Sequence, residues 1–327
     1  MSAAVIRASG LTKTFGDFVA VDGVDLEVQP GECFGMLGPN GAGKTSTMRM
    51  IGCVTPVTSG SLSVLGSDVT ARGAGRRVKA RLGVVPQEDS LDEELTVEEN
   101  LVVYARYFGI RTEVARQRAG EQLTFMSLAD RAHDKVRTLS GGMKRRLVIA
   151  RALVNDPDVV LLDEPTTGLD PQARHHIWDR LRTLGASGAT LVLTTHYMEE
   201  ATQLCDRLVI MDGGRVLVEG PPRELVRRCV PRHVVEVSRA ALDGRAMPAL
   251  DGCEVIDLHD RVLVHTDDGR AVVSALEGAG IDAEDVYARP ASLEDVFLAL
   301  TGRDLLDAGD AGDAAGSGAA PGGDGGP

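Results

Sequence analysis

Apolar residues follow two alternating patterns along the first 230 residues of this chain. Runs that are apolar at every position, such as Val159-Val160-Leu161-Leu162, are typical of strands buried on both faces of a parallel sheet. Between them, apolar residues recur at the spacing of amphipathic helices. This alternation predicts a mainly parallel α/β core. The predicted strands cover residues 5–11, 18–28, 33–37, 61–65, 82–85, 159–162 and 189–195, and the predicted helices cover 43–52, 197–205, 222–228 and a segment beginning at Pro171.

The pattern becomes helical between residues 96 and 153. Apolar residues recur there at near-helical spacing, at Val97, Leu101, Val102 and Tyr104 and again at Leu123, Met126 and Leu128. The first two strands of the chain are expected to bend around Gly16-Asp17 as a hairpin. We therefore expect one domain over residues 1–230, with a mixed sheet core, an antiparallel β subdomain and a helical subdomain at about 96–153.

A different order of elements begins after residue 230. Strands are predicted at 233–238, 254–258, 262–266 and 284–288, with a weak helix at 239–250 and a stronger one at 270–279. The resulting β-α-β-β-α-β order predicts a small α+β domain of the ferredoxin-like type at 231–303. A last helix at 292–301 follows, with Ser292 and Asp295 spaced like a capping box. The glycine- and alanine-rich tail at 304–327 is expected to be disordered.

Composition excludes several classes of protein. The hydrophobic fraction of 43% and the charged fraction of 25% are those of an ordinary globular chain. No apolar run approaches the roughly 20 residues that span a bilayer, and the first residues do not resemble a secretory signal. The five cysteines have no CxxC spacing, which favours free thiols in a reducing compartment. A net charge of −13 argues against non-specific nucleic-acid binding. We expect a cytosolic protein that reaches a membrane only through a partner.

The strongest local motif is the glycine-rich loop Gly38-Pro39-Asn40-Gly41-Ala42-Gly43-Lys44-Thr45. It matches G-x-x-x-x-G-K-[ST] and stands between a predicted strand and a predicted helix, as a phosphate-binding loop requires. Backbone N–H groups would hold the β-phosphate, Lys44 would neutralise β- and γ-phosphate charge, and the Thr45 hydroxyl would bind Mg²⁺. We include Ser46 among the nucleotide-binding residues. The predicted cofactors are therefore ATP and Mg²⁺.

Polar side chains that end other strands are candidates for the hydrolytic chemistry. Asp163 and Glu164 follow a buried strand, where carboxylates face the ligand crevice of an open α/β sheet. Asp163 would hold Mg²⁺, and Glu164 would orient or deprotonate the attacking water. His196 ends another strand and would contact the γ-phosphate. Gln87 would reach Mg²⁺ or the water. Each of His196 and Gln87, taken alone, is a weak signal.

A second anion-binding helix start lies in Leu139-Ser140-Gly141-Gly142-Met143. Ser140, Gly141 and Gly142 would expose backbone N–H groups at the positive end of a helix. The chain therefore either binds two nucleotides or shares one with another copy of itself. Asp170 is a candidate for the same site, although it could simply cap the helix at Pro171. Phe15, expected in a loop, could stack on adenine or be a core aromatic.

Taken in order, these motifs resemble the ATP-binding subunit of ATP-binding-cassette (ABC) transporters. The likeness covers about residues 5–228. Phe15 is similar to the A-loop aromatic of the family, residues 38–45 are similar to Walker A, and Gln87 is similar to the Q-loop. Residues 139–143 are similar to the family signature, residues 159–163 to Walker B, and Glu164 to the catalytic glutamate. Residues 168–170 are similar to the D-loop, and His196 is similar to the switch histidine. The resemblance implies a head-to-tail dimer in which the signature of one copy closes over the nucleotide held by Lys44 of the other.

Two departures narrow the resemblance. The signature ends in Met143 where many members have glutamine, and a basic run follows it, as in the branch that energises ABC-2-type exporters. The C-terminal part, ending in 293–298, resembles that of daunorubicin/doxorubicin-resistance ATPases, and residues 105–178 resemble nodulation-factor export ATPases. The resemblance implies a separately encoded membrane permease as partner and a location on the cytoplasmic face of a bacterial membrane. A translation or DNA-repair ATPase and an importer ATPase remain alternatives, and the cargo is not indicated.

Overall fold

The computed structural model describes residues 3–242 and 247–302, and the chain divides into two compact units, Met1–Glu219 and Gly220–Asp307. The predicted tail at 304–327 lies outside the described residues. Among the described helices, none combines the length and apolar character needed to cross a bilayer. Each unit is described by itself below.

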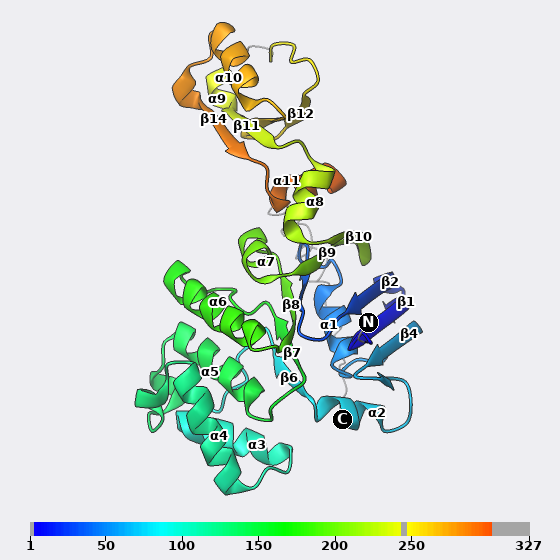
Figure 1. Ribbon diagram of the computed structural model, residues 1–327, viewed down its shortest axis with the longest axis vertical. Helices are drawn as coiled ribbons and strands as arrows, with labels where there is room; N and C mark the ends of the chain where they lie inside the picture. Colours follow the sequence, from blue (N-terminus) through cyan, green and yellow to red (C-terminus); the bar gives the residue numbers. More distant parts are fainter. Residues whose placement is uncertain (1–2, 243–246, 303–327) are drawn as a thin grey trace, which may run out of the picture. The chain divides into compact units, whose positions relative to one another are not determined.

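The first unit is built on a six-stranded sheet in the order β10-β9-β3-β8-β7-β6 (Figure 1). β3 pairs in parallel with both β8 and β9, and β7 pairs in parallel with both β6 and β8. Parallel pairing brings the carboxyl ends of β3, β7 and β8 to one edge, where ligands bind in open α/β sheets. The strands are β3 (Cys33–Leu37), β6 (Leu82–Val85), β7 (Val159–Asp163), β8 (Thr190–Thr195), β9 (Arg207–Asp212) and β10 (Arg215–Gly220).

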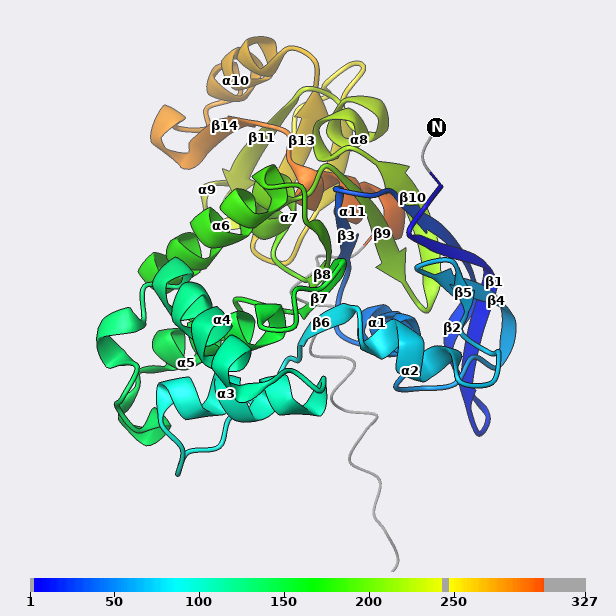
Figure 2. The same ribbon diagram turned by 60° about the horizontal axis from the view of Figure 1, so that its bottom comes forward.

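A second, antiparallel sheet has the order β2-β1-β4-β5. Helix α1 (Lys44–Ile51) lies between the two sheets and contacts β2, β7 and β8 (Figure 2). Residues of both sheets and of α1 form one continuous hydrophobic core, which fixes the helix and the loop before it. The strands are β1 (Ile6–Phe15), β2 (Phe18–Val28), β4 (Ser59–Val64) and β5 (Ser67–Asp68).

The helical subdomain follows β6, and its three α-helices gather at the side of the large sheet away from β1 and β2 (Figures 1 and 2). Its first helix begins at a capping box in which the Thr96 hydroxyl accepts from the Glu99 N–H and the Glu99 carboxylate accepts from the Thr96 N–H. Ser140 caps the last helix. The helices are α3 (Val97–Tyr107), α4 (Thr112–Phe125) and α5 (Gly141–Leu153), with short 3₁₀ turns at Ala129–Arg131 and Val136–Thr138.

The remaining helices of this unit are α2 (Ala74–Lys79), α6 (Pro171–Ala186) and α7 (Met198–Leu204). The sequence pattern does not predict α2, whose residues look like a short basic run. The expectation that Phe15 lies in a loop is wrong: it is the last residue of β1, where it pairs with Phe18 across a tight turn at Gly16-Asp17. Gly16 has φ +57°, which a glycine adopts without strain, so both strands extend to the turn.

The second unit contains an antiparallel sheet in the order β12-β13-β11-β14. Its elements follow the predicted β-α-β-β-α-β order; that the unit is a ferredoxin-like domain stays a prediction, as does the domain boundary at residue 230. Before this sheet comes α8, which packs against α11. The elements are α8 (Pro222–Cys229), β11 (His233–Ser238), α9 (Arg239–Leu242), β12 (Glu254–Asp257), β13 (Arg261–Thr266), α10 (Gly269–Gly278), a 3₁₀ turn at Ala283–Asp285, β14 (Val286–Pro290) and α11 (Leu293–Thr301).

Two predictions for the second unit are wrong in extent. Within the helix predicted at 239–250, Arg239–Leu242 is helical and residues 247–250 are not. Pro248 has no N–H to donate and disfavours a helix, which explains why the described residues around it are not helical. The strand predicted at 284–288 instead covers Val286–Pro290. β14 is an edge strand, where a proline at the last position leaves the ladder intact.

Candidate functional site

The phosphate-binding loop connects β3 to α1 and depends on glycines at defined positions. Gly41 and Gly43 have φ values of +79° and +95°. A Cβ on Gly43 would lie 2.5 Å from the Ala20 carbonyl oxygen, and a Cβ on Gly38 would lie 2.2 Å from the Met211 carbonyl oxygen. Neither backbone oxygen can move away as a flexible side chain could. The loop can therefore take this shape only with glycine at these positions.

Lys44 begins α1 and is buried under the loop. Its ammonium donates to the carbonyl oxygens of Gly38 at 2.7 Å and Pro39 at 2.9 Å, and it lies 3.8 Å from the Glu164 carboxylate. Burial lowers the pKa of Lys44, and the negative charges of Glu164 and Asp163 oppose this effect. The loop thus closes around a cation, at the place where phosphate charge would be neutralised.

Thr45 and Asp163 are brought together from α1 and the end of β7. The Thr45 hydroxyl donates to Asp163 Oδ1 at 3.1 Å. The Thr194 hydroxyl, from the neighbouring strand β8, donates to the same oxygen at 2.5 Å. A hydroxyl next to a fixed carboxylate is a ligand set of the kind that Mg²⁺ prefers. Two of the residues that the sequence predicts as metal ligands, Thr45 and Asp163, therefore lie side by side.

Glu164 follows β7 and is held from several sides. Its backbone adopts φ +47°, and its N–H donates to both the carbonyl and the hydroxyl oxygen of Thr194. Positive φ in a residue other than glycine stores strain and is concentrated at functional sites. The Thr167 hydroxyl donates to Glu164 Oε2 at 3.0 Å, and the Gln87 amide donates to the same atom at 3.4 Å. Glu164 is thus fixed at the centre of the site.

The charge of Glu164 is set by its neighbours. His196 Nδ1 lies 3.3 Å from Glu164 Oε2. Burial alone would raise the pKa of Glu164, but the His196 ring and the Lys44 ammonium outweigh burial and hold the pKa below its ordinary value. The carboxylate therefore stays ionised near neutral pH and is able to accept a proton or orient a water molecule.

His196 also contacts the helix that follows it. Its ring centroid lies 4.1 Å from that of Tyr197, and the Arg174 guanidinium lies 4.5 Å from the Tyr197 ring centroid. Because Arg174 belongs to α6, these rings connect the switch position to the helix after the predicted D-loop. Gln87 follows β6 and His196 follows β8, the two strands beside β7. Both side chains contact Glu164, so they approach it from opposite sides.

Four further predicted site residues, Ser140, Gly141, Asp170 and Phe15, lie at exposed positions. Ser140 and Gly141 are exposed at the beginning of α5, where the Ser140 hydroxyl accepts from the Met143 N–H. Asp170 is also exposed and caps α6 by accepting from the Ala173 N–H at 2.9 Å. Phe15 is 51% exposed, so it is not a core aromatic. The nucleotide-binding roles of these residues, and of Gly142, stay predictions.

Several residues of the site carry no motif that would have revealed them. Thr194 binds Asp163 and the Glu164 backbone, and its position just before Thr195-His196 is the only local signal. Glu200 is fully buried and accepts from the Thr166 hydroxyl and the Trp178 indole N–H. Arg145 donates to the backbone on both sides of Glu164. Their partners are far apart in sequence, so spacing alone does not find them.

Comparison with known proteins agrees with this geometry. Residues 21–167 match the family model described as ABC transporter. The Nod factor export ATP-binding protein I of Burkholderia pseudomallei (strain 1710b) is 48% identical over 311 residues, covering 94% of this chain and 100% of the relative. The chain belongs to the ABC transporter family. The protein of the same name from Cupriavidus metallidurans is 46% identical over 305 residues, covering 93% of this chain and 99% of its own.

Solved structures place the fold of this ABC ATPase among ATP-binding cassettes. The cbiO1 subunit from Clostridium perfringens, part of the ABC transporter complex cbiONQ, has a TM-score of 0.65 and 25% identity, covering 69% of this chain and 92% of its own. A cassette solved as a dimer in a post-hydrolysis state with ADP and Pi has a TM-score of 0.61 and 29% identity, covering 66% of this chain and 98% of its own. The chain is an ATP-binding, ATP-hydrolysing protein with the α/β fold of this family.

Proposed function

We propose that this ABC ATPase energises the export of a small molecule through a separately encoded ABC-2-type permease. The observation that carries the proposal is a hydrolytic site arranged around Glu164 in a chain whose relatives are named for Nod factor export. The ABC transporter family, the names of the relatives and the arrangement around Glu164 all favour an ATPase that drives transport. The proposed cargo is a drug, an antibiotic, a lipid or an oligosaccharide. The choice among them is left to the permease.

We further propose that the working unit is a head-to-tail dimer. Ser140 and Gly141 are exposed at the start of α5, while Lys44 and Glu164 form a separate cluster at the sheet edge. A helix N-terminus attracts a phosphate only if one can approach it. A second copy that brings its own nucleotide satisfies both features. The solved dimer with ADP and Pi is a relative that assembles in pairs.

Mg²⁺ is proposed as the metal cofactor, held by Thr45, Gln87 and Asp163. Among the described residues, no group of three or more His, Cys, Asp or Glu side chains could hold a metal ion by itself. An ion at Thr45 and Asp163 would therefore share its coordination with nucleotide oxygens and water, as Mg²⁺ does in other nucleotide sites. Bound there, the ion would neutralise charge on the β- and γ-phosphates. The protein residues keep the nucleotide in place and hold Glu164 for proton transfer.

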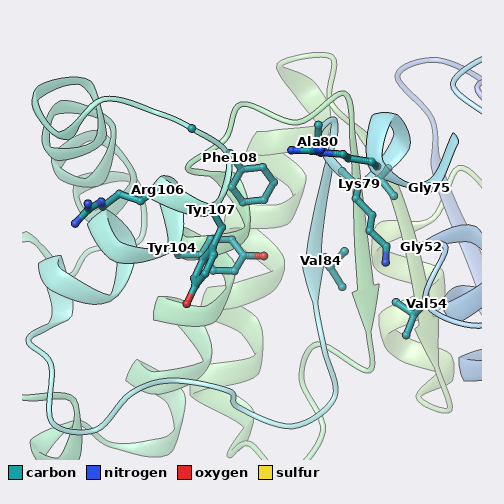
Figure 3. Close-up of a pocket in the computed structure, with 13 residues that line it drawn as sticks. Gly52, Val54, Gly75, Lys79, Ala80, Val84, Tyr104, Arg106, Tyr107 and Phe108 are labelled. Carbon is teal, nitrogen blue, oxygen red and sulfur yellow. The ribbon is translucent and has the colours of Figure 1, made fainter. Parts of the chain in front are cut away.

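The permease is expected to dock in a groove of about 930 Å³ beside the helical subdomain. Figure 3 shows Tyr104, Tyr107 and Phe108 on one side of it and Lys79 and Val84 on the other. Tyr107 is 83% exposed, and the basic residues Arg76, Lys79 and Arg106 are among those that line the groove. A groove lined by both aromatic and basic side chains suits an amphipathic helix that carries acidic residues. We therefore propose a cytoplasmic helix of the permease as the occupant.

The position of the groove also explains how docking would reach the site. Leu82 and Val84 line the groove and belong to β6. Pro86 and Gln87 follow directly, and Gln87 donates to Glu164. A helix pressed against β6 would therefore act on the loop that carries Gln87. We therefore propose that the protein lies on the cytoplasmic face of the membrane, bound through its permease.

The decisive experiment is co-purification from membranes with the products of neighbouring genes. Tyr107→Asp should weaken association with the permease by roughly tenfold or more, since it buries a charge in the apolar contact. It should leave the ATPase activity of the isolated chain unchanged. Tyr287→Asp is the matched control, because Tyr287 is also exposed but lies in the second unit. Co-purification with ribosomes or with a solute-binding protein would instead support a translation ATPase or an importer.

A further inference from the structure

Arg145 is a buried cation in the second turn of α5, the helix that begins at Gly141. It is 4% exposed, although arginine is rarely buried without partners. Nothing in the motifs assigns it a role. Arg145 lies one turn from the exposed end of the same helix. That end carries Ser140 and Gly141, which are proposed to bind the nucleotide of the other copy.

The Arg145 guanidinium joins two loops that are far apart in sequence. Its Nε donates to the Pro165 carbonyl at 2.7 Å, and Nη2 donates to the carbonyls of Asp163 and Glu164 at 3.0 Å each. Its Nη1 donates to the Pro86 carbonyl at 2.6 Å and to the Gln87 carbonyl at 3.2 Å. One planar group therefore fixes the backbone beneath both Gln87 and Glu164.

Other cations of α5 hold the segment after Gln87. Lys144 donates to Glu93 at 2.6 Å, and Arg151 donates to the carbonyl and hydroxyl oxygens of Ser90. Arg145 adds an ion pair with Asp89 at 3.5 Å. These contacts tie residues 89–93 to α5. Arg145 differs in its additional hydrogen bonds to the backbone at the end of β7.

We propose that Arg145 is a positioning residue that couples the two nucleotide sites of the dimer. This rests on the proposed head-to-tail assembly. In such a dimer, the N-terminus of α5 contacts the partner's nucleotide, while Gln87 and Glu164 serve the chain's own. A shift of α5 on closure moves the guanidinium, and with it the carbonyls of Gln87 and Glu164. Each site then becomes active only when the other has closed.

The chemistry of the side chain makes arginine specific for this task. Arginine presents five N–H donors in a rigid plane, whereas the lysine ammonium is a compact group with three donors. Arg145→Lys keeps the positive charge but cannot span carbonyls on both loops. Arg146→Lys is the matched control: Arg146 is the next residue of α5, and it donates to the carbonyls of Met126 and Ser127 within the helical subdomain.

The test measures ATP hydrolysis of the full-length dimer against ATP concentration. Cooperative wild-type protein should have a Hill coefficient above 1 and at most about 2, the number of sites. Arg145→Lys should bring the coefficient to about 1. Because a displaced catalytic group is poorly aligned, kcat should fall on the order of tenfold to 100-fold, with KM for ATP little changed. Arg146→Lys should retain the wild-type coefficient and kcat.

Arg145→Gln provides a second variant with hydrogen-bonding groups but no charge. Wild-type cooperativity in a folded Arg145 variant would overturn the proposal. So would loss of folding in both variants while Arg146→Lys folds, because the role of Arg145 would then be structural. A wild-type protein with a Hill coefficient of 1 and no ATP-dependent dimer would instead refute the proposed assembly itself. The two failures are therefore distinguishable.

Discussion

The Lys44 ammonium lies 3.8 Å from the Glu164 carboxylate, and both side chains are almost completely buried. The two residues belong to separate motifs: Lys44 lies at the end of the phosphate-binding loop, and Glu164 directly follows β7. Their opposite charges attract each other across this distance. A phosphate that binds Lys44 would therefore lie next to the carboxylate that we propose acts on water.

Glu164→Gln should separate binding from hydrolysis. The amide has the same shape and can still accept from the Thr167 hydroxyl, but it is not a base. We expect unchanged ATP affinity and a turnover lower by about 10² to 10⁴, so that the ATP-bound dimer accumulates. Steady-state hydrolysis and size-exclusion chromatography with ATP measure the two effects. Glu113→Gln, at an exposed position of α4, should change neither. Wild-type turnover in Glu164→Gln would show that another group is the base.

Lys44→Ala should weaken nucleotide binding itself. The variant removes the cation and the donor to the carbonyls of Gly38 and Pro39, so the loop loses its internal support. A hydrogen bond to a charged group contributes about 1.5–3 kcal/mol, which corresponds to roughly tenfold to 100-fold in affinity. Isothermal titration with a non-hydrolysable ATP analogue measures the loss. Lys135→Ala, an exposed lysine of the helical subdomain, should bind normally. Equal affinity in the two variants would contradict the assignment of the loop.

The core of the first unit and the centre of the site could be predicted because their signals are local. A glycine loop between strand and helix determines where Lys44 and Thr45 lie. An apolar run that ends in two carboxylates determines where Asp163 and Glu164 lie. Parallel strands then bring these ends together without further information. The same reasoning places His196 and Gln87, and both contact Glu164.

The parts that escaped prediction depend on partners distant in sequence. Arg145 looks like one member of a basic run, and its function as a donor exists only because 86–87 and 163–165 fold against α5. Glu200 belongs to no motif, and its burial and its hydrogen bonds from Trp178 and Thr166 appear only in the folded chain. The helix expected at 239–250 fails for a different reason: its apolar spacing is weak, and Pro248 interrupts it.

Glu200→Gln should make the stability of the protein less sensitive to a rise in pH above about 4.3. Burial is the main cause that raises the pKa of Glu200, and hydrogen bonds from Thr166 and Trp178 oppose it only in part. The folded state therefore binds a proton that the unfolded state has released above its ordinary pKa of about 4.3. Wild-type stability should fall as pH rises from that value through the raised pKa of the folded state, by about 1.4 kcal/mol for each pH unit between the two pKa values.

The glutamine variant carries no titrating group at this position, so that part of the slope should disappear. Melting temperatures measured between pH 5 and pH 8 in the full chain test this expectation. Glu199→Gln is the control, since Glu199 is the exposed neighbour on the same helix, and it should retain the wild-type slope. An unchanged slope in Glu200→Gln would mean that the buried carboxyl is not the titrating group.

Asp295→Asn should weaken the second unit, and the effect should depend on pH in the opposite direction. Asp295 is 1% exposed, accepts from Arg289 at 2.7 and 2.8 Å, and accepts from the Ser292 N–H at the start of α11. Burial alone would raise the pKa of Asp295. The nearby His265 ring, 3.6 Å from Asp295 Oδ1, and the hydrogen bonds from Arg289 outweigh burial and hold the pKa far below its ordinary value.

A lowered pKa in the folded state stabilises the protein above the unfolded pKa of about 3.9, and this contribution is lost as pH falls below it. Removing the carboxylate leaves Arg289 with fewer partners, at a cost of about 3–5 kcal/mol when a buried pair is broken. Hydrogen exchange of the α11 amides at pH 7 should therefore accelerate in Asp295→Asn. The exchange-derived stability should also vary less between pH 5 and pH 3 than in the wild type. Glu277→Gln, an exposed change on α10, should leave α11 protected. Wild-type protection in Asp295→Asn would show that apolar packing alone holds α11 to the sheet.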